Sequence, residues 1–249
     1  MSADAEERTG WASAPSVNSS PGAKLLPIAL SLIAGSADVI SFLGLGGLFT
    51  AHITGNLVIL AAHIVNGGSA PLAPILSVPV FIAALGLTRL LASGLEVIGF
   101  ASLRPLLVLQ LLLLICSFAL CAAAGPSIDP NAAKGIIAGM LGVAAMAVQN
   151  WLVQISLKGA PATAVMTSNI TRFVMDFGTV LLGRDPRDIA SARNRATRAW
   201  PAIVGFAIGC GLGAVCEAAF GLQSLELPVR FALLALVLGL SVKPDRDGR

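Results

Sequence analysis

Long apolar runs separated by short polar segments fill most of the chain beyond about residue 25. A helix that crosses ~30 Å of hydrocarbon needs roughly 20 apolar residues. Five runs reach that length, at residues 25–48, 72–92, 105–124, 135–157 and 200–220. A sixth run, 226–242, is shorter, and its two charges lie together at one end, where long side chains reach the interface. The pattern predicts an all-α fold: a polytopic membrane bundle of about six transmembrane helices.

Two further stretches, 54–66 and 167–183, are moderately apolar but are too short or too polar for ordinary spans. We predict each to be a short, broken or re-entrant helix. A bundle of eight spans is the alternative, in which both stretches cross the membrane. The mixed-charge stretch 184–198 is predicted to be a cytoplasmic linker.

Polar segments flank the apolar region. Residues 1–23 lack the basic start and apolar core of a signal peptide, and their polar composition predicts a disordered cytoplasmic N-terminal tail. Residues 24–157 are predicted to form a first membrane repeat. Residues 158–242 are predicted to form a second, with 135–157 counted as its first span. Residues 243–249 are predicted to be a cytoplasmic C-terminal tail.

The basic residues predict the orientation. If six spans alternate from a cytoplasmic N-terminus, 14 of the 16 Lys and Arg residues fall inside, and Lys134 and Arg230 fall outside. Cytoplasmic loops carry an excess of Lys and Arg in membrane proteins. We therefore expect both termini to be cytoplasmic.

Composition supports the membrane class. The chain is 56% hydrophobic and 12% charged, whereas an ordinary soluble domain is about 25% charged. This excludes a disordered chain and a disulfide-rich secreted module, and a net charge of +3 indicates no nucleic-acid partner. The four cysteines lie in apolar stretches and are typical of packing residues. No catalytic or phosphate-binding motif occurs, so we expect no enzyme, cofactor or metal. The expected partner is the lipid bilayer, and the oligomeric state is left open.

The sequence contains an internal repeat. Residues 50–57 read TAHITGNL and residues 163–170 read TAVMTSNI, at an offset of 163 minus 50, or 113. Upstream, Asp38 aligns with Asn150. Downstream, prolines that open later spans align in order: Pro79 with Pro201, and Pro105 with Pro228. Each half holds three spans, an odd number, which predicts that the second copy is inverted. Inverted repeats with short broken segments are typical of transporters, and a duplicated bundle that transports nothing is the alternative.

These motifs resemble those of the YoaK-like family of uncharacterised bacterial integral membrane proteins. The resemblance rests on GSADVISF at 35–42 and FTAHITGNL at 49–57, and it extends over about residues 25–242. In the second half it includes Gln149-Asn150 and Thr167-x-Asn169, although Ser168 stands where the family often has glycine. The resemblance implies a bundle of about six helices in the bacterial inner membrane. It implies no activity.

The T-x-N segments are candidate binding elements. Thr54, Gly55 and Asn56 precede an apolar run, so they mark a helix start, where backbone N–H groups lack partners. Such a start suits an anion, and a glycine allows a ligand to approach the backbone. Thr167 and Asn169 are the inverted counterparts. Two half-helices pointing at a shared central site are one interpretation. Thr and Asn side chains that only satisfy re-entrant turns are the other.

Asp38 is the only charged residue in the first predicted span. Ionisable groups inside a membrane are costly and are functional candidates by default. Asp38 is therefore a candidate for proton coupling, or else it caps backbone N–H groups and never titrates. His52 adjoins the first turn and can reach Asp38 or a solute. We expect six residues to converge near the bilayer midplane: Asp38, Thr54, Asn56, Asn150, Thr167 and Asn169.

Two ion pairs are predicted from spacing and location. Arg172 and Asp176 are four residues apart on one predicted helix, which favours a local pair, and attraction of an anion by Arg172 is the alternative. Glu217 and Arg230 both lie near the predicted outer face and are expected to pair.

The sequence favours a secondary transporter or permease for a small polar or anionic solute, with proton coupling as one form of it. A non-transporting membrane sensor or scaffold is the alternative. A polar, water-accessible cavity would favour the transporter, and a closed apolar bundle would favour the alternative.

Overall fold

The computed structural model describes residues 21–66, 71–125, 128–157 and 159–242, and within these ranges the chain is helical and contains no strand. The helices are α1 (Pro21–Gly44), α2 (Ile53–Val65), α3 (Leu72–Val97), α4 (Leu103–Ala124), α5 (Ala133–Ser156), α6 (Met166–Leu182), α7 (Pro186–Phe220), the short 3-10 helix η1 (Gly221–Leu225) and α8 (Glu226–Ser241). The predicted tails fall on residues 1–20 and 243–249, which lie outside the described residues. The N-terminal tail was predicted to reach residue 23, whereas α1 begins at Pro21.

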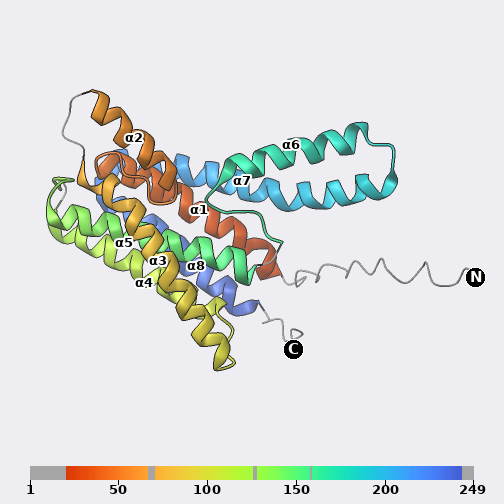
Figure 1. Ribbon diagram of the computed structural model, residues 1–249, viewed down its shortest axis with the longest axis horizontal. Coiled ribbons are helices and arrows are strands. Elements are labelled where there is room, and N and C mark those ends of the chain that lie inside the picture. The colour runs from red at the N-terminus through yellow and green to blue at the C-terminus, as the bar shows by residue number, and fades with distance from the viewer. Residues whose placement is uncertain (1–20, 67–70, 126–127, 158, 243–249) are drawn as a thin grey trace, which may run out of the picture.

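The long helices pack into one bundle, with α2 and α6 on its periphery (Figure 1). The first helix of the chain, α1, packs against α7 and α8, while α5 packs against α3 and α4. The short helix α2 lies against α3, and α6 lies against α7. Each short helix is therefore paired with the long helix that follows it in the chain.

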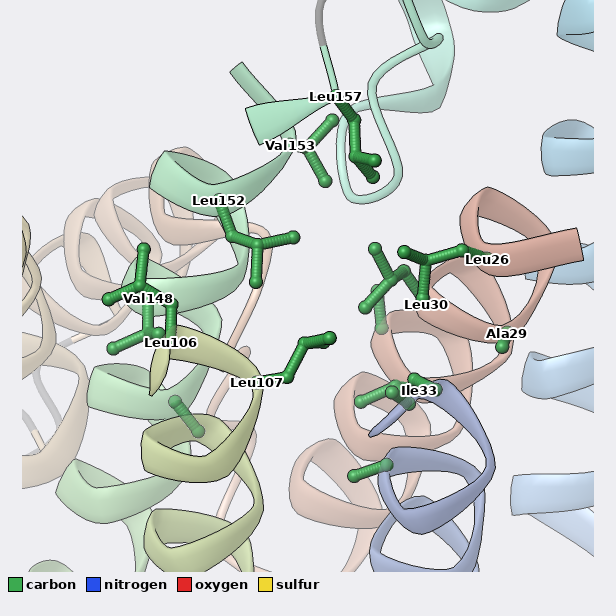
Figure 2. Close-up of a cluster of buried hydrophobic side chains, with 14 of the residues drawn as sticks. Leu26, Ala29, Leu30, Ile33, Leu106, Leu107, Val148, Leu152, Val153 and Leu157 are labelled. Carbon is green, nitrogen blue, oxygen red and sulfur yellow. The ribbon is translucent and has the colours of Figure 1, made fainter. Parts of the chain in front are cut away.

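The centre of the bundle is a cluster of aliphatic side chains from α1, α4 and α5. Figure 2 shows Leu30 and Ile33 of α1 near Leu107 of α4 and Leu152 of α5, and all four are buried. Full burial of such a side chain contributes about 1.5–3 kcal/mol in water. Within a bilayer that driving force is weak between helices, so close packing must supply more of the stability.

Small residues bring α1 and α7 together. Gly205, Gly209 and Gly213 recur every four residues along α7 and face the backbone of α1. A Cβ atom on Gly209 would lie 2.6 Å from the carbonyl oxygen of Leu32, a distance that real Cβ atoms do not adopt. Glycines at this spacing therefore allow the two backbones to approach closely, as small residues do in membrane helix pairs.

The helices are long and apolar enough for a membrane protein. In the described chain, five helical segments meet the length and composition needed to cross a bilayer: Gly22–Gly44, Leu72–Val97, Leu103–Ala124, Ala133–Ser156 and Pro186–Ser241. The last segment includes α7, η1 and α8. Large apolar side chains are exposed on the outer surface, among them Leu87 and Leu90 of α3. An all-helical, multi-pass membrane protein is thus supported.

The predicted linker at 184–198 is wrong from Pro186 onward, because residues 186–198 belong to the first half of α7. The helix starts at Pro186, and the side chain of Asp185 caps it by accepting a hydrogen bond from the backbone N–H of Arg187 at 2.8 Å. An acidic cap followed by proline is a known helix-start pattern. With α6, this half of α7 forms a helical hairpin that extends away from the bundle (Figure 1).

The first predicted span, 25–48, is also too long at its C-terminal end. The helix α1 ends at Gly44, and Gly46 and Gly47 then adopt φ values of +67° and +81°. This left-handed conformation is accessible to glycine at little cost. It turns the chain back toward α1, which brings residues 49–52 beside the helix that they have just left.

Candidate functional site

Asp38 holds the segment that links α1 to α2. Its side chain is 3% exposed. The Oδ1 atom accepts hydrogen bonds from the backbone N–H of Thr50 at 2.8 Å, from the Thr50 hydroxyl at 3.1 Å, and from the backbone N–H of Ala51 at 2.6 Å. Buried donors of this kind need partners, and the carboxylate supplies them. Asp38 thus caps backbone N–H groups just before α2.

The second carboxylate oxygen of Asp38 contacts a histidine. Oδ2 lies 2.5 Å from Nδ1 of His52, whose side chain is 36% exposed. This hydrogen bond is the main cause that raises the pKa of His52 above its ordinary value, and burial opposes it. The ring lies edge-on to Phe49 and Phe206, with centroids 6.1 and 5.5 Å away. Because Nδ1 is bonded to Asp38, Nε2 is the ring nitrogen that a solute can meet.

His52 and Asp38 line a pocket between α1, α2 and α7. Its volume is about 430 Å³, which falls within the ~300–1,000 Å³ typical of small-molecule sites. Its polar groups come from Asp38, His52 and Thr54. Its apolar walls include Phe49 and Phe206. The predicted residues Asp38, His52, Thr54 and Gly55 therefore meet at one pocket.

The start of α2 differs in detail from the prediction. The N-cap position is occupied by His52, not by Thr54, and no side chain caps the helix there. The Gly55 N–H bonds to the carbonyl oxygen of His52 at 2.9 Å, and first-turn N–H groups that lack such a partner are available to water or to a ligand. Gly55 serves a packing role, since a Cβ at this position would lie 2.8 Å from the Phe49 ring.

Asn56 also bonds to the segment that links α1 to α2. It is fully buried, and its amide exchanges two hydrogen bonds with the backbone of Phe49, each 2.8 Å long. Its Nδ2 also donates to the hydroxyl of Ser77 on α3 at 2.9 Å. This agrees with the interpretation in which Asn satisfies a re-entrant turn.

The second T-x-N segment makes a matching contact. Asn169 Nδ2 donates to the carbonyl oxygen of Ala162 at 2.5 Å, as Asn56 Nδ2 does to that of Phe49. The two asparagines are 113 residues apart, and so are the two acceptors (169 minus 56, and 162 minus 49). The sequence repeat is thus accompanied by a repeated local contact.

The residue that matches Asp38 by contact is Gln149, not Asn150. Gln149 is fully buried, and its Nε2 donates to the hydroxyl of Thr163 at 2.9 Å, where Thr163 aligns with Thr50. Among the described residues, the Asn150 side chain bonds to the carbonyl oxygen of Met146 on its own helix. The alignment chosen from sequence is therefore displaced by one residue at this point.

Gln149 belongs to a neutral polar network that the sequence did not reveal. Its Oε1 accepts from Nε2 of Gln110 on α4 at 2.7 Å, and its Nε2 also donates to the carbonyl oxygen of Leu30 on α1 at 2.9 Å. Helical periodicity predicts that Gln149 faces the core, because it lies three residues from both Met146 and Leu152, which are buried. The first half of the chain thus has a charged cluster where the second has a neutral one.

The remaining predicted residues lie elsewhere. Thr167 and Arg172 are exposed on α6, and no residue from 163–172 lines the pocket at Asp38. The prediction of an Arg172–Asp176 pair is wrong, because Asp176 pairs with Arg195 of α7, with Nη2 at 2.6 Å. The predicted Glu217–Arg230 pair is also replaced.

Arg230 instead pairs with Glu226 one turn earlier on α8, at 2.6 Å. Both side chains are largely exposed, so this pair contributes little to stability. Within the described residues, no group of three or more His, Cys, Asp or Glu side chains is placed to hold a metal ion.

Comparisons with known proteins identify a family. No curated protein matches the chain. No solved structure matches it either. Residues 26–238 match a family described as "Protein of unknown function (DUF1275)", which includes all of the membrane helices apart from a few terminal residues. This agrees with the resemblance of the T-x-N motifs to the YoaK-like proteins. The chain therefore belongs to the DUF1275 family of proteins of unknown function.

Proposed function

We propose that the protein is a secondary transporter for a small polar or anionic solute, which binds in the pocket between α1, α2 and α7. One observation carries the proposal. A buried carboxylate, Asp38, is bonded to a partly exposed imidazole, His52, that lines an open pocket in a helical membrane protein. Ionisable groups in such proteins commonly mark solute or proton pathways.

The proton in this proposal is exchanged at His52. Asp38 is held by the donors of Thr50 and Ala51, so its place is fixed by the backbone. His52 contacts both the carboxylate and the pocket, and it can gain or lose a proton near neutral pH. A change of charge on His52 alters its bond to Asp38, and that bond lies at the junction of α1 and α2. Solute, proton and helix position are then coupled at one place.

We propose that six spans form an inverted repeat, an arrangement that permits alternating access. In the proposed arrangement α1, α3 and α4 of the first half correspond to α5, α7 and α8 of the second. The packing agrees with this correspondence. The contacts of α1 with α7 and α8 match the contacts of α5 with α3 and α4. The short helices α2 and α6 extend toward opposite ends of the molecule in Figure 1, as half-helices of inverted repeats do. Both termini are cytoplasmic in this proposal, and the membrane is the bacterial inner membrane.

Solute binding is tested by thermal unfolding of purified protein against a library of small metabolites. A ligand that binds the folded state raises the unfolding midpoint. At least one solute should do so for the wild type and for His63→Gln, but not for His52→Gln. His63 is the matched control. It lies in α2, whose N-cap is His52, and its ring bonds to the carbonyl oxygen of Ile59 and not to Asp38. A library without a stabilising solute, or a shift retained in His52→Gln, contradicts the proposal.

A membrane scaffold is the second candidate, and the α6–α7 hairpin favours it. One face of α6 carries exposed apolar residues at helical spacing: Ile170, Val174, Phe177 and Leu181. Such a stripe can receive a partner. Uptake by the purified protein in lipid vesicles separates the two functions, because a scaffold moves no solute.

A further inference from the structure

We infer that the solute of this pocket is a small monocarboxylate with a short apolar body, bound with its carboxylate against His52 and the first turn of α2. The inference rests on the proposed function and names the class of solute. It is carried by the chemistry of the pocket lining, which places a few hydrogen-bond donors beside aromatic and aliphatic walls.

The polar groups of the pocket are suited to an anion. His52 presents Nε2, which donates when the ring is protonated. The start of α2 has no side-chain cap and carries the positive end of the helix dipole, and Thr54 of its first turn lines the pocket. The donors therefore come from the imidazole and from the first turn of α2. A carboxylate can accept from all of them.

The same pocket is poorly suited to a cation. Its carboxylate, Asp38, has one oxygen occupied by donors of Thr50 and Ala51 and the other by His52. A bound ammonium group would have to displace one of these donors, and a buried donor without a partner is costly. The occupied carboxylate therefore orients His52 and does not serve as a ligand for positive charge.

The apolar walls exclude a second charge on the solute. Phe49 and Phe206 flank the imidazole, and Val39 and Val58 complete the lining around them. A dicarboxylate would have to bring a second charge against these side chains, at a large desolvation cost. An alkyl or aryl body would instead be stabilised by contact with them. One charge and one apolar end describe a monocarboxylate.

Anion and proton bind together in this arrangement. The other titratable groups that line the pocket with His52 are Asp38 on α1, which contacts the ring, and the thiol of Cys210 on α7. With the imidazole protonated, Asp38 and His52 together are neutral, and the bound anion leaves the pocket with one net negative charge. With the imidazole neutral, the anion would add to the charge of Asp38. Binding of the anion therefore requires the protonated ring. The transported anion and proton are together equivalent to the undissociated acid.

Cys210 provides a reporter inside the pocket. In a variant with Cys116, Cys121 and Cys216 changed to serine, Cys210 is the remaining thiol. Its alkylation by N-ethylmaleimide is followed with butyrate, butyramide, butylammonium or succinate at equal concentration. We expect butyrate to slow alkylation several-fold and the other three to leave it unchanged. The thermal midpoint with the same four compounds is the second measurement, and it does not depend on thiol reactivity.

His52→Gln tests the anion contact itself. Glutamine can still donate to Asp38 but carries no charge, so protection by butyrate, measured as the ratio of alkylation rates with and without butyrate in the same variant, should be lost. His63→Gln should keep the protection. Protection by butyramide, butylammonium or succinate equal to that by butyrate overturns the inferred class and leaves the pocket as the site. Absence of any effect on Cys210 and on the midpoint, for these compounds and for the metabolite library, overturns the proposed function as well.

Discussion

A single carboxylate, that of Asp38, accepts the hydrogen bonds of several donors in the segment that precedes α2. Asp38→Asn keeps one oxygen to accept from Thr50 and Ala51, so it should cost about 1–2 kcal/mol. Asp38→Leu leaves buried N–H groups without an acceptor, at about 1–3 kcal/mol for each unpaired group. Thermal unfolding in detergent should rank wild type, Asp38→Asn and Asp38→Leu in that order. Equal midpoints for the two variants would mean that Asp38 does not cap the segment.

His52 should make the stability depend on pH. Its folded-state pKa is raised, mainly by the hydrogen bond to Asp38, so its contribution is complete below the unfolded pKa of about 6.5 and is lost as pH rises through the folded pKa. The unfolding midpoint of wild type relative to His52→Gln should therefore be highest at acidic pH and decline above neutrality. Midpoints measured from pH 6 to pH 9 test this. A difference that grows as pH rises would have the wrong sign.

Packing between α1 and α7 depends on glycines at selected positions of one helix. Gly209 faces the backbone of Leu32, whereas a Cβ on Gly211, two residues later, has nothing within 4 Å. Gly211→Ala should be neutral or should stabilise by up to about 1 kcal/mol, because alanine favours helix. Gly209→Ala should destabilise, because the helices must separate. Detergent unfolding of the two variants measures the contrast, and equal effects would argue against the close approach.

The sequence predicts elements that are marked by local patterns of residues. It does not predict pairings that depend on how the helices pack against each other. Apolar length identifies α3, α4 and α5, and the T-x-N repeat leads to the asparagine clamps at Asn56 and Asn169. The first half of α7 was predicted as a linker because of its many charged residues, although Asp185 and Pro186 mark a helix start. The partner of Asp176 is Arg195 rather than its helix neighbour, because α7 packs against α6.

The candidate residues of the first half lie together in the structure, whereas those of the second half do not join them. Asp38, His52 and Thr54 meet because the chain turns back at Gly46 and Gly47, within a short stretch of sequence. The counterpart in the second half depends on which side of α5 faces the core. Gln149 and Asn150 are adjacent in sequence, and the pattern alone does not choose between them. The contact of Gln149 with Gln110 and Leu30 requires three helices to be placed first.

The basic residues predict a topology for the whole molecule. Six spans with a cytoplasmic N-terminus place Asn66, at the end of α2, outside and the C-terminus after Arg249 inside. In a chain without its native cysteines, a cysteine introduced at Asn66 should react with an impermeant reagent added outside sealed cells, and one introduced after Arg249 should react only once the membrane is opened. Labelling of both positions from the same side would contradict six spans and favour a different count.

The central claim is that the pocket at Asp38 and His52 binds a solute and a proton together. Calorimetric titration of butyrate at pH 8, in two buffers with different ionisation heats, counts the protons taken up for each butyrate bound. The account predicts a net proton uptake in the wild type and in His63→Gln, with no binding in His52→Gln. Butyrate binding without proton uptake, or an equal uptake in His52→Gln, would contradict it.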